Sequence, residues 1–292
     1  MRRKIQSKGK SIMNKNKILE ILNLSPETEK AVISALSMKN FAEICNNAYS
    51  GEAPDYPILS RKPLTRLAAV INLLSEKYEE YKSLGVPEDI IAETFRDVSL
   101  REKIYENKTG KPGINKDDTL WFRHLIKCEI FKIGVLQFQP FEMIYLDEEF
   151  LGEPYMEFSK EQKEKLPSGA PVINCHIQQG AVLSTESVKT SFADAQALLS
   201  KIYPETEFKA ILCYSWLLYQ DMINILPENS NIKAFAENFE IIGNIQDSEQ
   251  AFENLFGKAC KRPPKLKNPT KLQKLAAAKP KYFGFACGIK YL

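Results

Sequence analysis

The sequence contains few of the residues that build metal centres and disulfide frameworks. Only two of its 292 residues are histidine, His124 and His176, which argues against a metal enzyme with several histidine ligands. The six cysteines are spread along the chain without a C-x-x-C pair. This pattern excludes a zinc ribbon or a disulfide scaffold and favours a reducing compartment. We therefore expect a cytoplasmic protein without a bound metal.

Long apolar runs are also missing. The longest candidate, residues 210–219, is far shorter than the roughly 18 residues that a membrane helix needs. The N-terminus lacks the apolar core of a signal peptide. Hydrophobic residues make up 44% and charged residues 26% of the chain, an ordinary balance for a globular protein. The length predicts two compact units, at about 100–200 residues per domain. The lack of a long apolar run predicts no membrane association.

Acidic residues are absent from both ends of the chain. Residues 1–18 hold seven Lys or Arg, and residues 258–292 hold ten. Residues 19–257 therefore contain the remaining 23 basic residues and all 37 acidic residues, which gives this part of the chain a net charge of −14. An acidic body repels nucleic acid, and we do not expect a nucleic-acid enzyme. The basic C-terminal stretch could pair with the acidic body, with ligand phosphates, or with RNA or another acidic partner.

The first half of the chain has the apolar spacing of helices. Residues 1–16 are predicted to be a basic flexible tail. Apolar residues then recur at steps of three and four, which predicts a helical N-terminal domain over residues 17–130. Proline opens and glycine closes helices, and Asp is a favoured N-cap. The clearest predicted helices run from Pro63 to Gly85, from Pro87 through Phe95, and from the N-cap Asp117 through Trp121 to Cys128.

From residue 131 onward strands alternate with helices, which predicts an α/β or α+β domain with at least one parallel crossover over residues 131–292. Two short strands are expected at residues 135–138 and 143–146, because Pro140 should break the first ladder. Further strands are predicted at residues 172–177, 208–215, 235–242 and 282–292, with helices at residues 184–203, 221–226, 247–260 and 270–278.

The strand, loop, helix and strand of residues 172–215 form the unit most suggestive of a binding site. Ligands of parallel strands lie beyond their carboxyl ends, and these two strands end in polar residues that include His176 and Ser215. Gly180 lets the connecting backbone approach a ligand, and the N-terminus of the following helix is an anion site. A pyrophosphate cradle is one interpretation. A plain turn with a single glycine is the other.

Six stretches of this sequence together resemble a bacterial family: WFRHL (121–125), FKIG (131–134), LQFQ (136–139), NCHI (174–177), CYSWLL (213–218) and LPENSNI (226–232). The resemblance extends over roughly residues 20–290 and is to acyltransferase-domain proteins with a helical N-terminal domain and a GNAT-like C-terminal domain. The chain has Tyr214 where relatives commonly carry His, and Tyr219-Gln220 where they carry Asp-Pro.

The resemblance implies a helical domain followed by a GNAT-like mixed-sheet acyltransferase domain. In GNAT-type enzymes the fourth and fifth strands, here residues 172–177 and 208–215, part at their ends. The pantetheine of acetyl-CoA or another acyl-CoA lies in the gap. The next loop and helix N-terminus bind the pyrophosphate, although the usual Gln/Arg-x-x-Gly-x-Gly/Ala signature is not matched here. The residues implied for cofactor binding are Ile177, Gln178, Gln179, Gly180, Ala181 and Val182.

Acyl transfer to an amine needs a base, donors for the oxyanion and an acid for the departing thiolate. His176 is the only imidazole in this domain and is the predicted base. Ser215 or Tyr219 would protonate the thiolate. Gln137 and Asn231 are candidates for hydrogen bonds to substrate. Each of these residues also has a structural interpretation as a satisfied or packed side chain. We expect an amine or hydroxyl acceptor on a small molecule or peptide.

Three alternatives stay open at this point. The chain could be a catalytically degenerate GNAT-like protein that binds or senses acyl-CoA or another nucleotide, which the unmatched loop signature favours. Cys213 and His176 could form a nucleophile–base pair across neighbouring strands. His124 and Cys128 have the i, i+4 spacing of two metal ligands on one helix, but no further partner is evident. Cys175 is adjacent to His176 on a strand, so the two should face opposite sides.

Overall fold

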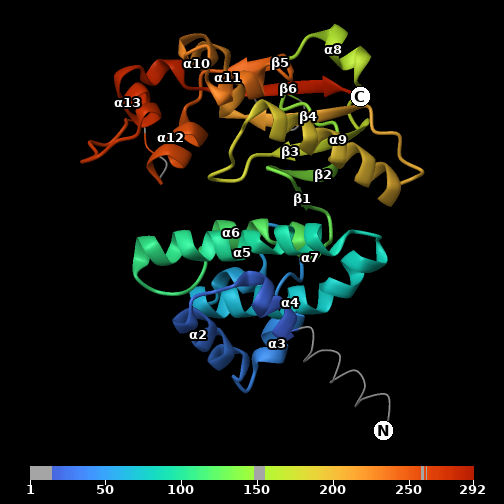
Figure 1. Cartoon of the computed structure of the whole chain (residues 1–292), viewed down its shortest axis with the longest axis vertical. Helices are drawn as coiled ribbons and strands as arrows, with labels where there is room; N and C mark the ends of the chain where they lie inside the picture. Colours follow the sequence, from blue (N-terminus) through green and yellow to red (C-terminus); the bar gives the residue numbers. More distant parts are fainter. Residues whose placement is uncertain (1–14, 148–154, 258–259, 261) are drawn as a thin grey trace. The chain divides into compact units, whose positions relative to one another are not determined.

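The computed structural model describes residues 15–147, 155–257, 260 and 262–292, and the chain divides into two compact units (Figure 1). The N-terminal unit ends at Lys132 and the C-terminal unit begins at Ile133. Most of the predicted tail, residues 1–14, lies outside the described residues. Its last two residues, Lys15 and Asn16, belong to a helix that covers residues 15–22. The last two residues of the predicted tail are therefore helical.

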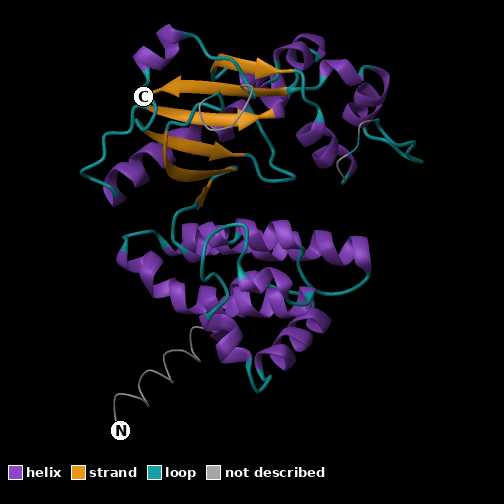
Figure 2. Cartoon of the chain, turned by 180° about the vertical axis from the view of Figure 1, so that it is seen from behind, coloured by secondary structure: helices purple, strands orange, loops and turns teal. Residues whose placement is uncertain are grey.

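The N-terminal unit is built almost entirely from helices (Figure 2). Its central helix begins with Pro63, and Gly85 follows its end with a φ of +81°, so the predicted proline and glycine boundaries are confirmed. Tyr81 of this helix is buried and donates to the carbonyl of Leu125 at 3.1 Å. The labelled elements are α2 (Pro26–Leu36), α3 (Phe41–Asn46), η1 (Pro57–Ser60), α4 (Pro63–Ser83), α5 (Glu88–Thr109), α6 (Lys116–Trp121) and α7 (Arg123–Ile126).

The prediction of one continuous helix from Asp117 to Cys128 is wrong. Asn115 is the N-cap instead, and its side-chain oxygen accepts from the N–H of Asp118 at 2.7 Å. The helix breaks after Trp121 into the short α7, and Cys128 has a left-handed φ of +56°. The N-cap is therefore Asn115, two residues before the predicted Asp117. Asn and Asp are both good N-caps, so the residue type alone does not decide between them.

The C-terminal unit contains a six-stranded mixed sheet with the order β1-β2-β3-β4-β6-β5. Strands β3 and β4 are parallel, and the other registered neighbours are antiparallel. The predicted fold class, a helical domain followed by a mixed sheet with one parallel crossover, is confirmed. The strands are β1 (Phe131–Ile133), β2 (Leu136–Glu142), β3 (Pro171–His176), β4 (Ala210–Ser215), β5 (Glu240–Ile245) and β6 (Phe285–Tyr291).

Pro140 does not break the first strand. It lies within β2, opposite Ile173 of β3. Strand β1 has three residues and is joined to β2 by a two-residue turn, so it cannot reach as far along β2 as Pro140. Among the described residues, no other strand pairs with β2 on that side, and a missing N–H is tolerated at an unpaired edge. The second predicted strand, residues 143–146, is a loop in which Met143 donates to the carbonyl of Ala170 at 2.8 Å.

Helix α9 (Thr185–Ile202) makes the crossover from β3 to β4 and covers one face of the sheet (Figures 1 and 2). Its Phe192 contacts Phe138 of β2 with ring centroids 6.1 Å apart. The opposite face is covered by residues that follow β2, including the buried Tyr145 and Met156. The remaining elements are α8 (Lys160–Lys165), η2 (Trp216–Leu218), α10 (Gln220–Ile225), α11 (Asn231–Ala236), α12 (Glu249–Phe256), α13 (Lys271–Ala278) and η3 (Pro280–Tyr282).

The predicted strand at residues 235–242 begins too early. Phe235 ends up in α11, and the strand β5 begins at Glu240. The apolar side chains that suggested a strand form an aromatic cluster instead: Phe239 packs on Phe235 at 5.3 Å and on Phe192 of α9 at 5.7 Å.

Among the described residues, no helix combines the length and the apolar character that crossing a membrane requires.

Candidate active site

Strands β3 and β4 separate at their carboxyl ends. Their parallel register covers three residue pairs, from Val172 with Ala210 to Asn174 with Leu212. Within the described residues this ladder goes no further, although β3 stays paired with β2 to its end and β4 stays paired with β6 to its end. The main-chain N–H and C=O groups on the facing edges of the last residues therefore lie outside the ladder between the two strands.

Polar side chains gather on one face of the sheet beside this separation. The register places Gln137 opposite His176 and Gln139 opposite Asn174. Gln137 and Gln139 are 1% and 5% exposed, and His176 is half-buried. The Nε2 atom of His176 lies 3.3 Å from Oε1 of Gln139. An amide oxygen only accepts, so Nε2 is the donor in this contact, and in the neutral tautomer that this contact selects the lone pair is on Nδ1.

Tyr214 lies on the same face of the sheet as His176, as the β3–β4 register extended by two residues predicts. Its hydroxyl donates to the carbonyl of Ile144 at 2.6 Å, and its ring stacks on Phe285. Burial raises the pKa of Tyr214, and the nearby Cys287 raises it further. Tyr214 therefore stays neutral and is fixed to the main chain. Neither Tyr214 nor Gln139 is among the site residues predicted from the sequence. The two-residue spacing of Gln137 and Gln139 is the signal that puts both amides on one face of a strand.

Ser215 lies on the face of the sheet opposite His176, because side chains alternate along a strand. The hydroxyl is buried and accepts from the N–H of Leu217 at 3.1 Å, so Ser215 caps η2. A hydroxyl that accepts can still donate its proton. The structure thus gives Ser215 a structural contact and does not bring its side chain beside the histidine.

Tyr219 is packed against the chain that leads into β6. It is 5% exposed, and its hydroxyl lies 3.4 Å from Oδ2 of Asp221, to which it donates. Burial and then the Asp221 carboxylate raise the pKa of Tyr219. The ring lies against Gly284, where an added Cβ would come within 2.5 Å of Cε2 of Tyr219 and of the carbonyl oxygen of Ile245. Position 284 therefore requires glycine if Tyr219 is to keep this place.

We expect Gly284→Ala to lower the free energy of unfolding by about 1–3 kcal/mol through overpacking against a backbone oxygen. Gly257→Ala is the comparison, because its Cβ would meet no atom within 4 Å and it costs only the roughly 1 kcal/mol of a left-handed backbone. Thermal unfolding of both variants measures the difference. A smaller loss for Gly284→Ala than for Gly257→Ala would contradict the contact with Ile245.

The predicted cofactor-binding loop, residues 177–182, connects β3 to α9. Ala181 donates to the carbonyl of Gln178 at 3.1 Å, and Gly180 has a φ of +83°, which fits the third position of a type II turn. Gly180 is exposed, and an added Cβ would meet nothing within 4 Å. Ser184 caps α9 by accepting from the N–H of Ser187 at 3.2 Å. The loop leads directly into the capped N-terminus of an 18-residue helix.

The structure argues against the pairing of Cys213 with His176. Cys213 is fully buried on the face of the sheet opposite His176. Its thiol is next to that of Cys175, which together with burial raises the pKa of Cys213 well above its usual range. A buried thiol held in the protonated form is a poor nucleophile. Cys175 and His176 face opposite sides, in keeping with strand alternation.

The spacing of His124 and Cys128 does not produce a metal site. Cys128 lies beyond the end of α7, so the two residues do not share a helix. Nδ1 of His124 lies 3.2 Å from a carboxylate oxygen of Glu129, yet burial lowers the pKa of His124 to about 4, with a contribution from Arg123. The imidazole is therefore neutral at pH 7. Across the described part of the chain, no group of three His, Cys, Asp or Glu residues is arranged to hold a metal.

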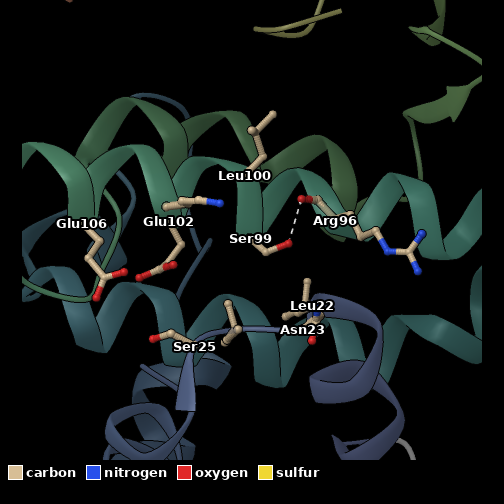
Figure 3. Close-up of a pocket in the computed structure, with 10 residues that line it drawn as sticks. Leu22, Asn23, Ser25, Arg96, Ser99, Leu100, Glu102 and Glu106 are labelled. Atoms are coloured by element: carbon tan, nitrogen blue, oxygen red, sulfur yellow. Dashed lines mark hydrogen bonds between the residues drawn. The ribbon is translucent and has the colours of Figure 1, made fainter. Parts of the chain in front are cut away.

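The N-terminal unit contains a separate surface pocket of about 600 Å³ (Figure 3). It lies between α5 and the connection that precedes α2. Glu102 is its buried carboxyl, whose pKa is raised by burial and then by Glu106, and it accepts from Thr28 at 3.2 Å. No residue of the predicted site lines this pocket. The lining residues are Leu22, Asn23, Leu24, Ser25, Arg96, Ser99, Leu100, Glu102, Lys103 and Glu106.

Comparison with known families assigns both halves of the chain. Residues 130–282 match the model of the GNAT-like C-terminal domain, which covers more than half of the sequence. The chain belongs to the GNAT-like family. Residues 13–128 of this GNAT-like protein match the N-acyltransferase N-terminal domain. The resemblance seen in the sequence is thus confirmed. No curated protein matches the chain by sequence.

Solved structures share the fold over nearly the whole length of the GNAT-like chain. One is an acyltransferase in complex with decanoyl-CoA, with a TM-score of 0.70 and 17% identity. Another is an acyltransferase in complex with decanoyl-CoA and teicoplanin, with a TM-score of 0.69 and 16% identity. A mutant acyltransferase in complex with octanoyl-CoA has a TM-score of 0.70 and 15% identity. Each alignment covers 95% of this chain and 87% of the other, and at this identity the likeness shows the fold.

Proposed function

We propose that this GNAT-like protein transfers an acyl group from acetyl-CoA or another acyl-CoA to an amine or hydroxyl of a small molecule or peptide. The separation of β3 and β4 at their carboxyl ends is the observation that carries the proposal. The two amides of a pantetheine arm can hydrogen-bond to main-chain groups at such an edge, as an added strand does. The acyl-CoA complexes of the structural neighbours support the same ligand.

In the proposed reaction the acceptor nitrogen or oxygen attacks the thioester carbonyl, and the C–S bond breaks as the new acyl bond forms. His176 takes the acceptor proton on Nδ1, since Gln139 holds Nε2 as a donor. Main-chain N–H groups at the parted strands stabilise the oxyanion. The departing thiolate takes a proton from Ser215 or Tyr219, the two hydroxyls near the end of β4. Residues 177–182 and the N-terminus of α9 bind the pyrophosphate.

Binding and turnover can be tested on the full chain. A ligand at 100 times its Kd stabilises a protein by about 2.7 kcal/mol, which for a domain of this size raises Tm by roughly 5–10 °C. We expect such a shift with acetyl-, octanoyl- or decanoyl-CoA and with free CoA. We also expect release of the CoA thiol with at least one acceptor from a panel of amines, hydroxyl compounds and amine-bearing peptides.

The second candidate function is binding or sensing of acyl-CoA without turnover. It is favoured by the loop Gln178-Gln179-Gly180-Ala181-Val182, which does not match the usual pyrophosphate signature. A thermal shift with CoA species but no thiol release across the acceptor panel would establish this second function. Absence of any shift with every CoA species would contradict both functions.

A further inference from the structure

The chain from Arg262 to Lys281 carries a concentrated positive charge, and we call it the basic segment. It has no acidic residue. Its seven cations are all exposed, and none takes part in an ion pair with another described residue. They are Arg262, Lys265, Lys267, Lys271, Lys274, Lys279 and Lys281. Among the described residues, the acidic side chains therefore do not neutralise this segment through ion pairs.

Hydrogen bonds hold the basic segment at the carboxyl end of β4. The N–H of Trp216, the residue after β4, donates to Oε1 of Gln250 in α12 at 3.0 Å. Gln273 of α13 then donates to the carbonyl of Leu255 in α12 at 2.6 Å. Thr270 and Gln273 also form a capping box that fixes the start of α13. Figure 1 shows α12 and α13 beyond the end of the sheet toward which β3 and β4 point.

The proposed pyrophosphate loop at this edge has no cation of its own. Residues 177–184 include no Lys or Arg, and the first turn of α9 carries Glu186. Backbone N–H groups can bind a phosphate there, but residues 19–257 have a net charge of −14. Such a body disfavours a ligand with several phosphate charges unless nearby cations compensate. The basic segment supplies cations at the same edge.

We propose that the basic segment binds the 3′-phosphorylated ADP end of acyl-CoA, while residues 177–182 hold the pyrophosphate. This inference rests on the function proposed above and names where the charged end of that ligand lies. Lys271 and Lys274 are one helical turn apart on α13 and both are exposed, so they present two ammonium groups on one side of the helix. Nucleic acid is the other polyanion that such a segment could bind.

The test measures how the full chain binds CoA and 3′-dephospho-CoA by calorimetry at low and high salt. The variant is Lys271→Gln with Lys274→Gln, since glutamine keeps the helix propensity of lysine. We expect its affinity for CoA to fall about five- to tenfold at low salt, as for the loss of two exposed ion pairs. Its affinity for 3′-dephospho-CoA should fall less, so the preference of the wild-type chain for CoA should shrink. High salt should reduce the same preference in the wild-type chain.

The matched control is Lys160→Gln with Lys201→Gln. Both lysines are exposed. Lys160 begins α8 and Lys201 lies in the last turn of α9. Figure 1 shows both of these segments toward the amino ends of β3 and β4, away from α12 and α13. The control should bind both ligands as the wild-type chain does. An unchanged preference for CoA in the Lys271 and Lys274 variant would overturn the inference and leave the proposed function standing. The inference would also be overturned if the Lys271 and Lys274 variant lost affinity for a short RNA but kept its affinity for CoA. If the wild-type chain binds neither CoA nor 3′-dephospho-CoA, the proposed function fails as well.

Discussion

Replacing His176 with alanine should lower kcat for acyl transfer by about 10²- to 10⁴-fold, the usual contribution of a positioned general base. The affinity for acyl-CoA should stay near the wild-type value, because the imidazole is proposed to act on the acceptor proton. The geometric basis is the 3.3 Å contact of Nε2 with Gln139, which directs the basic Nδ1 away from that amide. Thiol release with an accepted acceptor measures kcat, and calorimetry with CoA measures the affinity.

The control for this experiment is His124→Ala, which removes the other histidine of the chain. His124 belongs to the N-terminal unit, where burial keeps its ring neutral, and we assign it no part in the reaction. Its loss should leave kcat within about twofold of wild type, as for most changes away from a site. Equal kcat in the His176→Ala variant and the wild-type chain would remove His176 from the mechanism.

Local signals in the sequence predicted the elements that depend on their own residues. Pro63 and Gly85 bound α4, and Thr270 caps α13, because capping and proline geometry are decided within one turn. The elements that were misplaced depend on distant partners. Pro140 is tolerated in β2 because β1 is short, and Phe239 packs on Phe192 from α9. Neither fact can be read from neighbouring residues.

In the candidate site, too, the sequence predicted what depends on the residue itself and not what depends on distant partners. His176 could be chosen from the sequence because it is the only histidine in its domain. The partnership with Gln139 needed the β2–β3 register, which a sequence pattern does not fix. The structural contacts of Ser215 and Tyr219 also come from residues outside their strand. Their proposed role as proton donors stays a prediction.

The N-terminal unit offers the second large effect, through the buried carboxylate of Asp97. Asp97 is 0% exposed and accepts from Nε of Arg101 at 3.0 Å and from Nε1 of Trp121 at 2.9 Å. Arg101 also reaches Asp118 at 2.6 Å. These side chains join α5 to α6. Removing one partner of a buried ion pair leaves the other charge uncompensated, which costs more than losing an exposed pair.

We expect Asp97→Ala to lower the free energy of unfolding of the N-terminal unit by about 2–3 kcal/mol, somewhat below the usual cost of breaking a buried pair because Arg101 is partly exposed. For a domain of this size the Tm should fall by roughly 6–15 °C. Trp121 and Trp216 lie in different units. Fluorescence of Trp121 in a Trp216→Phe background therefore reports unfolding of the N-terminal unit alone.

Two further variants show whether this loss comes from the buried charge. Asp118→Ala removes a carboxylate whose side chain is 14% exposed, and Arg101 keeps its contact with Asp97 in this variant. It should therefore cost less than Asp97→Ala, about 1 kcal/mol. Asp97→Asn keeps acceptor oxygen for Trp121 but removes the charge, so its Tm should lie between those of Asp97→Ala and the wild-type chain. If Asp97→Ala unfolds at the wild-type temperature, the ion pair does not join α5 to α6. The stability of the unit then comes from the apolar packing around α4.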